Sequence, residues 1–102
     1  MAEVKWTPDA RDDLAGIHQD IAPDSRPAAA AIILLVINAV ARLRYFPQSG
    51  RAVPEFGVKS LREVIVGSYR VVYRWRGDEV QIIRVRHGAR LLSDTDLPSA
   101  NL

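Results

Sequence analysis

The chain has 102 residues, of which 48% are hydrophobic and 25% are charged, and this is the composition of one ordinary globular domain. The absence of cysteine excludes disulfides and thiolate metal sites, and the formal net charge is only +2. The charge is unevenly distributed, because residues 51–90 carry nine basic and four acidic side chains whereas residues 1–50 carry five basic and six acidic ones. Eight of the nine are arginine, which pairs well with carboxylates and phosphates, so an anionic partner is expected.

The N-terminal part of the chain predicts a strand followed by a helix. A strand is expected at residues 3–6, and Thr7 can then cap a helix that Pro8 begins and Pro23 ends. One side of this helix is an apolar stripe made of Leu14, Ile17 and Ile21. The N-terminus has no basic flank followed by an apolar run, so no secretory signal is predicted and the cytoplasm is the expected location.

Residues 26–46 predict a second helix of unusual composition. Its segment 27–41 carries no charged residue, and Asn38 is the only strongly polar one. The run is shorter than the roughly 20 apolar residues that cross a membrane, so no membrane association is expected. A helix that is apolar on every side must be buried on every side, and we expect the sheet, the first helix and a partner protein to cover it; ordinary packing within the domain is the alternative. The residues predicted to contact the partner are Ile33, Val36, Ile37 and Val40.

The second half of the chain predicts a three-stranded antiparallel meander. Its strands are expected at residues 59–66, 69–76 and 79–87, because Gly67-Ser68 and Gly77-Asp78 are suitable two-residue hairpin turns. The predicted fold class is α+β, with the N-terminal strand completing a sheet that packs on the two-helix hairpin. We expect residues 1–92 to form this single domain and residues 93–102 to form a C-terminal tail.

If both turns contain two residues, the register of the strands decides which side chains share a face. One face is then aromatic, points to the helices and carries Tyr69, Val71, Tyr73 and Trp75. The other face is predicted to carry Glu63, Arg70, Arg74, Arg76 and His87. Arg70 is expected opposite Val85 and diagonal to both Glu63 and His87, within reach of a long side chain. Arg84 and Arg86 are expected on the aromatic face, at the margin of the sheet.

The predicted group of Glu63, Arg70 and His87 has two interpretations. In a ribonuclease, a carboxylate or imidazole takes the proton of a 2′-hydroxyl, the arginine stabilises the charged phosphorus centre, and another group protonates the leaving oxygen. The alternative is that Glu63 merely pairs with an arginine and that His87 caps a strand end through a hydrogen bond. The two histidines lack the spacing of zinc ligands, and nucleotide-binding motifs are absent, so no metal or cofactor is expected.

Three sequence blocks carry a resemblance to a known family. They are FPQSGR after the second helix, LREVIVGSYRVVYRW in the first hairpin, and VQIIRVRHGAR in the last strand. Together they resemble the RelE/ParE superfamily of toxins from bacterial type II toxin–antitoxin systems, over roughly residues 4 to 92. The resemblance implies a ParD-like antitoxin that wraps the toxin along its helical hairpin and sheet edge.

The same resemblance implies one of two targets. RelE-like members cut mRNA in the ribosomal A site, and ParE-like members inhibit DNA gyrase. Arg70 matches the arginine of the nuclease members and His87 falls near a catalytic histidine, but the lysine-rich set is missing and no tyrosine follows His87. The residues of the FPQSGR and RHGAR blocks resemble ParE more closely, so gyrase is the favoured target. A nuclease that uses Glu63, Arg70 and His87 is the alternative. The residues expected to bind the target are Arg74, Arg76, Arg84, Arg86 and Arg90.

Overall fold

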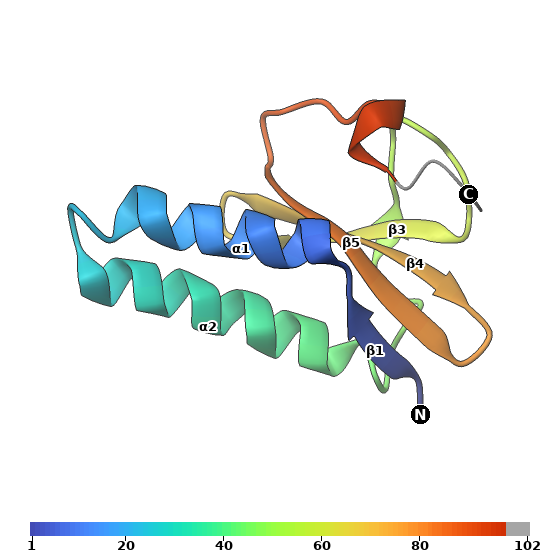
Figure 1. Cartoon of the computed structure of the whole chain (residues 1–102). Helices are drawn as coiled ribbons and strands as arrows, with labels where there is room; N and C mark the ends of the chain where they lie inside the picture. The colour runs from blue at the N-terminus through green and yellow to red at the C-terminus, as the bar shows by residue number, and fades with distance from the viewer. Residues whose placement is uncertain (98–102) are drawn as a thin grey trace.

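A computed structural model, which describes residues 1–97, has one five-stranded sheet with two helices packed against one face (Figure 1). The elements in chain order are β1 (Glu3–Trp6), α1 (Pro8–Ile21), α2 (Arg26–Arg42), β2 (Arg51–Ala52), β3 (Leu61–Val66), β4 (Tyr69–Arg76), β5 (Glu79–His87) and the 3-10 helix η1 (Asp94–Asp96). The strand order is β1-β5-β4-β3-β2, with β1 parallel to β5 and the other pairs antiparallel. The predicted α+β fold, in which the N-terminal strand completes the meander, is confirmed.

Each helix begins at a side-chain cap, and the first of these caps, Thr7, was predicted from the sequence. Thr7 Oγ1 accepts a hydrogen bond from Ala10 N at 3.1 Å and donates one to Ile83 O at 3.1 Å, so the start of α1 is tied to β5. Ser25 Oγ accepts from Ala28 N at 3.2 Å and caps α2 in the same way. α2 ends at Arg42, earlier than the predicted residue 46, because the chain already turns through residues 43–45.

The sheet is covered on both faces, which the sequence did not predict. The helices bury one face around residues such as Val36, Val71, Tyr73 and Ile82. The second face, opposite the helices, carries a separate apolar cluster of Val53, Leu61, Val72, Ile83, Leu92 and Leu97, with Phe56 packed against it. Residues 93–97 therefore pack on the domain instead of forming the start of a tail, while residues 98–102 lie outside the described part. Charged side chains beside this cluster, such as Glu63 and Arg70, are consequently buried.

The first hairpin has the predicted register, and the second has it only in part. Glu63 lies opposite Val72, as expected, and Tyr73 lies opposite Ile82. Beyond that pair, however, Val72 lies opposite Arg84, so Ile83 is an extra residue in β5 and forms a β-bulge. Every side chain of β5 after Ile83 therefore lies on the opposite face from the one predicted.

The bulge corrects three placements. Arg70 lies opposite Arg86 and not opposite Val85, so Arg84 and Arg86 share the second face with Arg70. His87 lies opposite Tyr69 on the helix side, where the two rings meet edge-on with centroids 5.8 Å apart. The prediction that His87 joins Glu63 and Arg70 is wrong.

The domain leaves one side of α2 exposed, although its composition predicted burial on every side with a partner protein covering part of the helix. Leu34, Leu35 and Ile37 are 59%, 52% and 46% exposed. Val36 and Val40 point into the core, with 0% and 3% exposure, so the prediction that these two contact a partner is wrong. Within residues 1–97, no helix is long and apolar enough to span a membrane.

Candidate functional site

Four alternating charges form a continuous chain across the second face of the sheet. Glu63 is fully buried and accepts hydrogen bonds from Arg51 Nε and Arg70 Nε, both at 2.7 Å. Arg70, only 5% exposed, donates from Nη1 and Nη2 to the two oxygens of Glu55 at 2.6 and 2.7 Å. We call Arg51, Glu63, Arg70 and Glu55 the ion-pair chain.

Local sequence explains why Arg51 meets Glu63. Tyr73 Oη donates to Pro47 O at 2.6 Å and accepts from Gly50 N at 3.0 Å, which draws the FPQSGR segment onto the sheet. A Cβ on Gly50 would lie 2.6 Å from both Tyr73 Oη and Glu63 O, so only glycine fits. The next residue, Arg51, then pairs with Glu63 as the first residue of β2. The glycine of the FPQSGR motif therefore allows the backbone of this segment to lie close against the sheet.

The ion-pair chain also holds the C-terminal segment, residues 88–97, which we call the strap. Glu55 Oε2 accepts from Leu92 N at 2.9 Å, and Arg70 Nη1 donates to Arg90 O at 3.3 Å. At the other end of the strap, Asp96 Oδ1 accepts from Arg86 Nη2 at 2.6 Å. The strap is therefore fastened to the sheet by charged groups near both of its ends.

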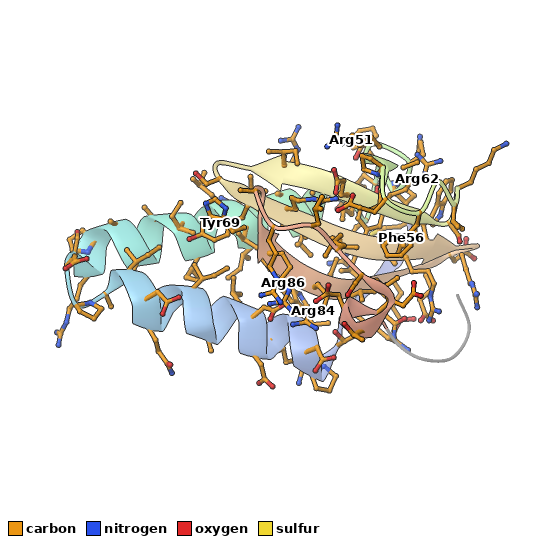
Figure 2. All side chains as sticks on the ribbon, turned by 90° about the horizontal axis from the view of Figure 1, so that it is seen from above. Arg51, Phe56, Arg62, Tyr69, Arg84 and Arg86 are labelled. Atoms are coloured by element: carbon orange, nitrogen blue, oxygen red, sulfur yellow. The ribbon has the colours of Figure 1, made fainter. Side chains whose placement is uncertain are left out.

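Arg84 and Arg86 lie side by side between α1 and the strap (Figure 2). Arg84 donates from Nε and Nη2 to the two oxygens of Asp13, at 2.8 and 2.9 Å. Asp13 also accepts from Val85 N at 2.9 Å, so this carboxylate takes the place of a neighbouring strand where β5 extends past β1. Both arginines, predicted to bind the target, are engaged within the domain.

The electrostatics of this face favour the charged forms of Glu55, Arg70 and Asp96. Hydrogen bonds from Arg70 lower the pKa of Glu55 from 4.5 to about 2, and the bond to Glu55 raises the pKa of Arg70. Burial raises the pKa of Asp96, but hydrogen bonds from Ser93 and Arg86 outweigh it and leave the pKa below its ordinary value. Near neutral pH, Glu55 is too weak a base, and Arg70 too weak an acid, to exchange protons with a substrate.

Three other predicted site residues have identifiable surroundings. His87 is exposed, and its Nδ1 accepts from Ala89 N at 3.2 Å at the end of β5. Arg74 donates to Gln81 Oε1 at 2.6 Å, and Arg90 is exposed. The pairing of Glu63 with arginine and the cap formed by His87 match the structural alternative that the sequence left open.

Four of the ion-pair partners on this face of the sheet were not identified from the sequence. Glu55 and Arg51 were recognisable as the charges of the loop after α2, but no local pattern places them beside Arg70. Asp13, the partner of Arg84, is distant from it in sequence. Asp96, the partner of Arg86, lies in the predicted tail. Within the described chain, no group of three or more histidines and acidic residues could hold a metal ion.

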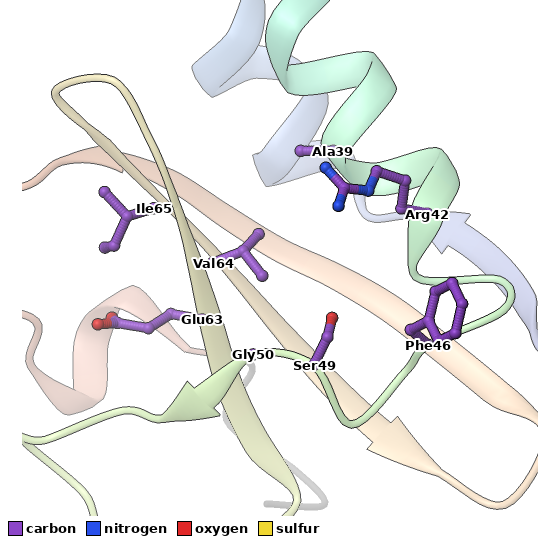
Figure 3. A pocket seen from close by; sticks show the side chains of 8 residues that line it. All are labelled: Ala39, Arg42, Phe46, Ser49, Gly50, Glu63, Val64 and Ile65. Carbon is purple, nitrogen blue, oxygen red and sulfur yellow. The ribbon is translucent and has the colours of Figure 1, made fainter.

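A cleft of about 440 Å³ lies between α2 and the outer edge of β3 (Figure 3). Residues 64–66 of β3 pair with β4 on one side, but because β2 pairs only with Arg62 and Glu63, their outer edge has no strand partner within residues 1–97. Arg42 extends from the end of α2 over this cleft, and Phe46 and Val64 line it. The cleft therefore offers a free strand edge next to a cationic and apolar wall.

Comparison with known proteins places this geometry in context. Residues 4–92 match the family described as "ParE toxin of type II toxin-antitoxin system, parDE". The curated protein Toxin RelE2 of Caulobacter vibrioides is 37% identical over 92 residues, which cover 89% of this chain and all of that protein.

Two solved structures share the fold. One, titled chromosomal ParDE TA system from P. aeruginosa, has a TM-score of 0.72 at 24% identity and covers 85% of this chain and 96% of that one. The other, a copper-bound mutant toxin from Helicobacter pylori, has a TM-score of 0.64 at 18% identity and covers 90% and 100%. At these identities the two structures show the fold alone.

Proposed function

The chain belongs to the ParE toxin family of type II toxin–antitoxin systems, and from this premise we propose that it inhibits DNA gyrase and is neutralised by a ParD-like antitoxin. Its place of action would be the cytoplasm, where gyrase works. The relative named Toxin RelE2 favours a second candidate, a ribosome-dependent mRNA nuclease. The two candidates differ in what they require of Arg70.

Arg70 is buried and its guanidinium is fully hydrogen-bonded, and this observation favours gyrase over mRNA as the target. A nuclease needs an accessible cation to bind the phosphate, and the guanidinium of Arg70 already donates to Glu63, Glu55 and the carbonyl of Arg90. Turning Arg70 toward a substrate would break its bonds to Glu55 and to the buried Glu63, which would keep only Arg51 as a charged partner. His87 cannot assist, because it lies on the other side of the sheet. These observations support a toxin that works by binding a protein.

The exposed apolar side of the helices supports the proposal that an antitoxin binds there. Besides Leu34 and Leu35, an apolar groove of about 560 Å³ runs between the helices and is lined by residues that include Trp6, Leu14, Ile33 and Ile37. Covering an exposed leucine or isoleucine contributes about 1.5–3 kcal/mol, so a partner helix gains substantially here. The free edge of β3 beside Arg42 can accept an extended segment of the same partner.

The test compares the two targets directly. Purified toxin is added to gyrase in a DNA supercoiling and cleavage-complex assay, and in parallel to translating ribosomes with an mRNA cleavage readout. We expect inhibited supercoiling, intact mRNA, and recovery when the operon's antitoxin is added. Cleaved mRNA with normal supercoiling would instead support the nuclease, and expression without antitoxin that leaves growth unaffected would reject both candidates.

A further inference from the structure

We propose that Arg11 and His18 determine the specificity of the groove between the helices, by selecting an antitoxin helix that carries two carboxylates beside its apolar stripe. The inference rests on the proposed function, in which an antitoxin covers this groove. Apolar area alone would admit any amphipathic helix, whereas two cations at a fixed spacing set both the partner and its register.

Arg11 and His18 are exposed on the side of α1 that borders the groove. The rest of the groove is apolar and is lined by Trp6, Leu14, Ala15, Ile33 and Ile37, so no acidic residue of the described chain lines it. Seven positions separate the two cations on one helix, which places them about two turns, or 10 Å, apart along its axis. One wall of an apolar groove therefore carries two positive groups at a defined spacing.

Neither cation has an acidic partner in its own domain. Within residues 1–97, the side chains of Arg11 and His18 form no hydrogen bond or ion pair. The positions three and four residues away, which share their side of the helix, hold only Thr7, Pro8, Leu14, Ala15, Ile21 and Ala22. By contrast, the domain pairs each arginine of the ion-pair chain with a carboxylate.

The acidic residues of α1 face away from the groove. A separate hollow beside β5 contains three of them and is lined by residues that include Asp12, Asp13, Asp20, Arg86, His87 and Arg90. Asp9 shares this side of the helix with Asp13, four residues away. The opposite wall of the groove, α2, has no acidic residue, and Glu3 of β1 alternates with Val4 and Trp6, which pack toward the helices. The groove is therefore locally positive, although α1 carries four acidic residues and one arginine.

The charge of Arg11 does not serve the helix that carries it. Arg11 is the fourth residue of α1, close to the N-terminal end, where the helix dipole favours negative side chains and disfavours positive ones. Removing this charge should consequently leave the stability of the domain unchanged. A role in binding can therefore be measured apart from folding.

Charge complementarity identifies the occupant of the groove as a helix of another protein. A second copy docked through the same groove would bring the cations of both copies together, because an isologous contact places a patch opposite itself. A nucleic acid would offer phosphates but no aliphatic side chains for the apolar walls. An amphipathic helix supplies an apolar stripe, and carboxylates seven residues apart along its border match the spacing of Arg11 and His18.

The two cations differ in how their charge depends on pH. Arginine stays protonated, whereas histidine is the side chain that ordinarily changes its charge between pH 5 and pH 8. Among the described residues that line the groove, Arg11 is the only other ionisable one. Carboxylates of a partner stay ionised above about pH 5. Antitoxin binding should therefore tighten from pH 8 to pH 6 through His18.

The experiment measures the Kd of the operon's purified antitoxin for toxin variants by titration calorimetry at pH 8 and pH 6. Arg11→Gln should raise the Kd by roughly tenfold at both pH values, as expected for an arginine paired with a carboxylate at an interface. His18→Gln should remove a tightening between pH 8 and pH 6 that is roughly two- to fivefold in wild type, the range of an exposed ion pair. Other groups titrate in both proteins and cancel in this comparison.

Lys59→Gln is the matched control. Lys59 is exposed and lies outside the helices, so this variant loses one positive charge without touching the groove. It should bind the antitoxin like wild type at both pH values, and the thermal midpoints of all three variants should stay unchanged.

A charge exchange tests the carboxylates of the partner. Arg11→Glu should weaken binding further than Arg11→Gln, and lysine at one acidic position of the antitoxin, when each is replaced in turn, should restore it. If wild-type toxin binds the antitoxin and Arg11→Gln and His18→Gln bind equally well at both pH values, the assigned specificity is overturned and the proposed function stands. An antitoxin that fails to bind wild-type toxin overturns both. A toxin that dimerises alone, through a contact that Arg11→Glu disrupts, would assign the groove to a second copy and overturn the inference.

Discussion

Replacement of Glu55 by glutamine removes one charge from the ion-pair chain and preserves the volume of the side chain. The Glu55 carboxylate, 16% exposed, accepts from Arg70 at 2.6 and 2.7 Å and from Leu92 N at 2.9 Å. Its pKa falls from 4.5 to about 2 in the folded protein. At about 1.4 kcal/mol per pKa unit, this depression corresponds to about 3 kcal/mol of stability that the variant lacks.

The pH dependence of this loss has a definite sign. Because the pKa of Glu55 is lower in the folded than in the unfolded protein, the carboxylate stabilises the fold fully above pH 4.5, and the stabilisation disappears as the pH falls toward 2. The difference in unfolding free energy between wild type and Glu55→Gln should therefore be about 3 kcal/mol at pH 7 and should close toward zero near pH 2. Other carboxyl groups titrate in both proteins and cancel in this difference.

Urea unfolding, followed by the fluorescence of Trp6 and Trp75 and by far-UV circular dichroism, measures the difference from pH 7 to pH 2.5. The control is Glu3→Gln, because the Glu3 side chain is 71% exposed and lies 3.8 Å from Lys5, and such pairs contribute less than about 1 kcal/mol. A gap that stays constant across this range, or one no larger than that of the control at pH 7, would refute the assigned role of Glu55.

Three further predictions concern single positions. Gly50→Ala should lower the unfolding free energy by about 1–3 kcal/mol, because its Cβ would overlap the hydroxyl of Tyr73, whereas Gly16→Ala, with nothing within 4 Å, should be neutral or stabilising in the same urea experiment. His87→Ala should arrest growth as strongly as wild type when expressed without antitoxin, because its ring is remote from Arg70; survival of these cells would revive the nuclease candidate. Leu34→Asp should weaken antitoxin binding by roughly tenfold in titration calorimetry with an unchanged thermal midpoint, and normal affinity would remove α2 from the proposed interface.

Local chemistry in the sequence predicted most of the fold. The alternation in residues 69–76 and the glycine turns at residues 67 and 77 predicted β4 and both hairpins, and both glycines do adopt positive φ. Thr7 predicted the start of the first helix, and the uncharged segment 27–41 predicted a second helix too apolar for the domain alone to cover. These features depend on near neighbours in the chain, so the sequence contains the information needed to infer them.

The candidate site depended on contacts that no local pattern records. The extra residue Ile83 is apolar and lies between apolar and basic neighbours, so in a strand buried on both faces nothing in the alternation marks a bulge. That one residue moved Arg84 and Arg86 onto the second face and His87 off it.

The sequence by itself therefore determined the family, the helices, the strands and the pairing of Glu63 with Arg70. Only the tertiary structure decided that Arg70 is enclosed, because Glu55 and the strap reach it from segments 15 and 20 residues away. Enclosure depends on which distant segments fold over a face, and side-chain periodicity within one strand carries no information about that.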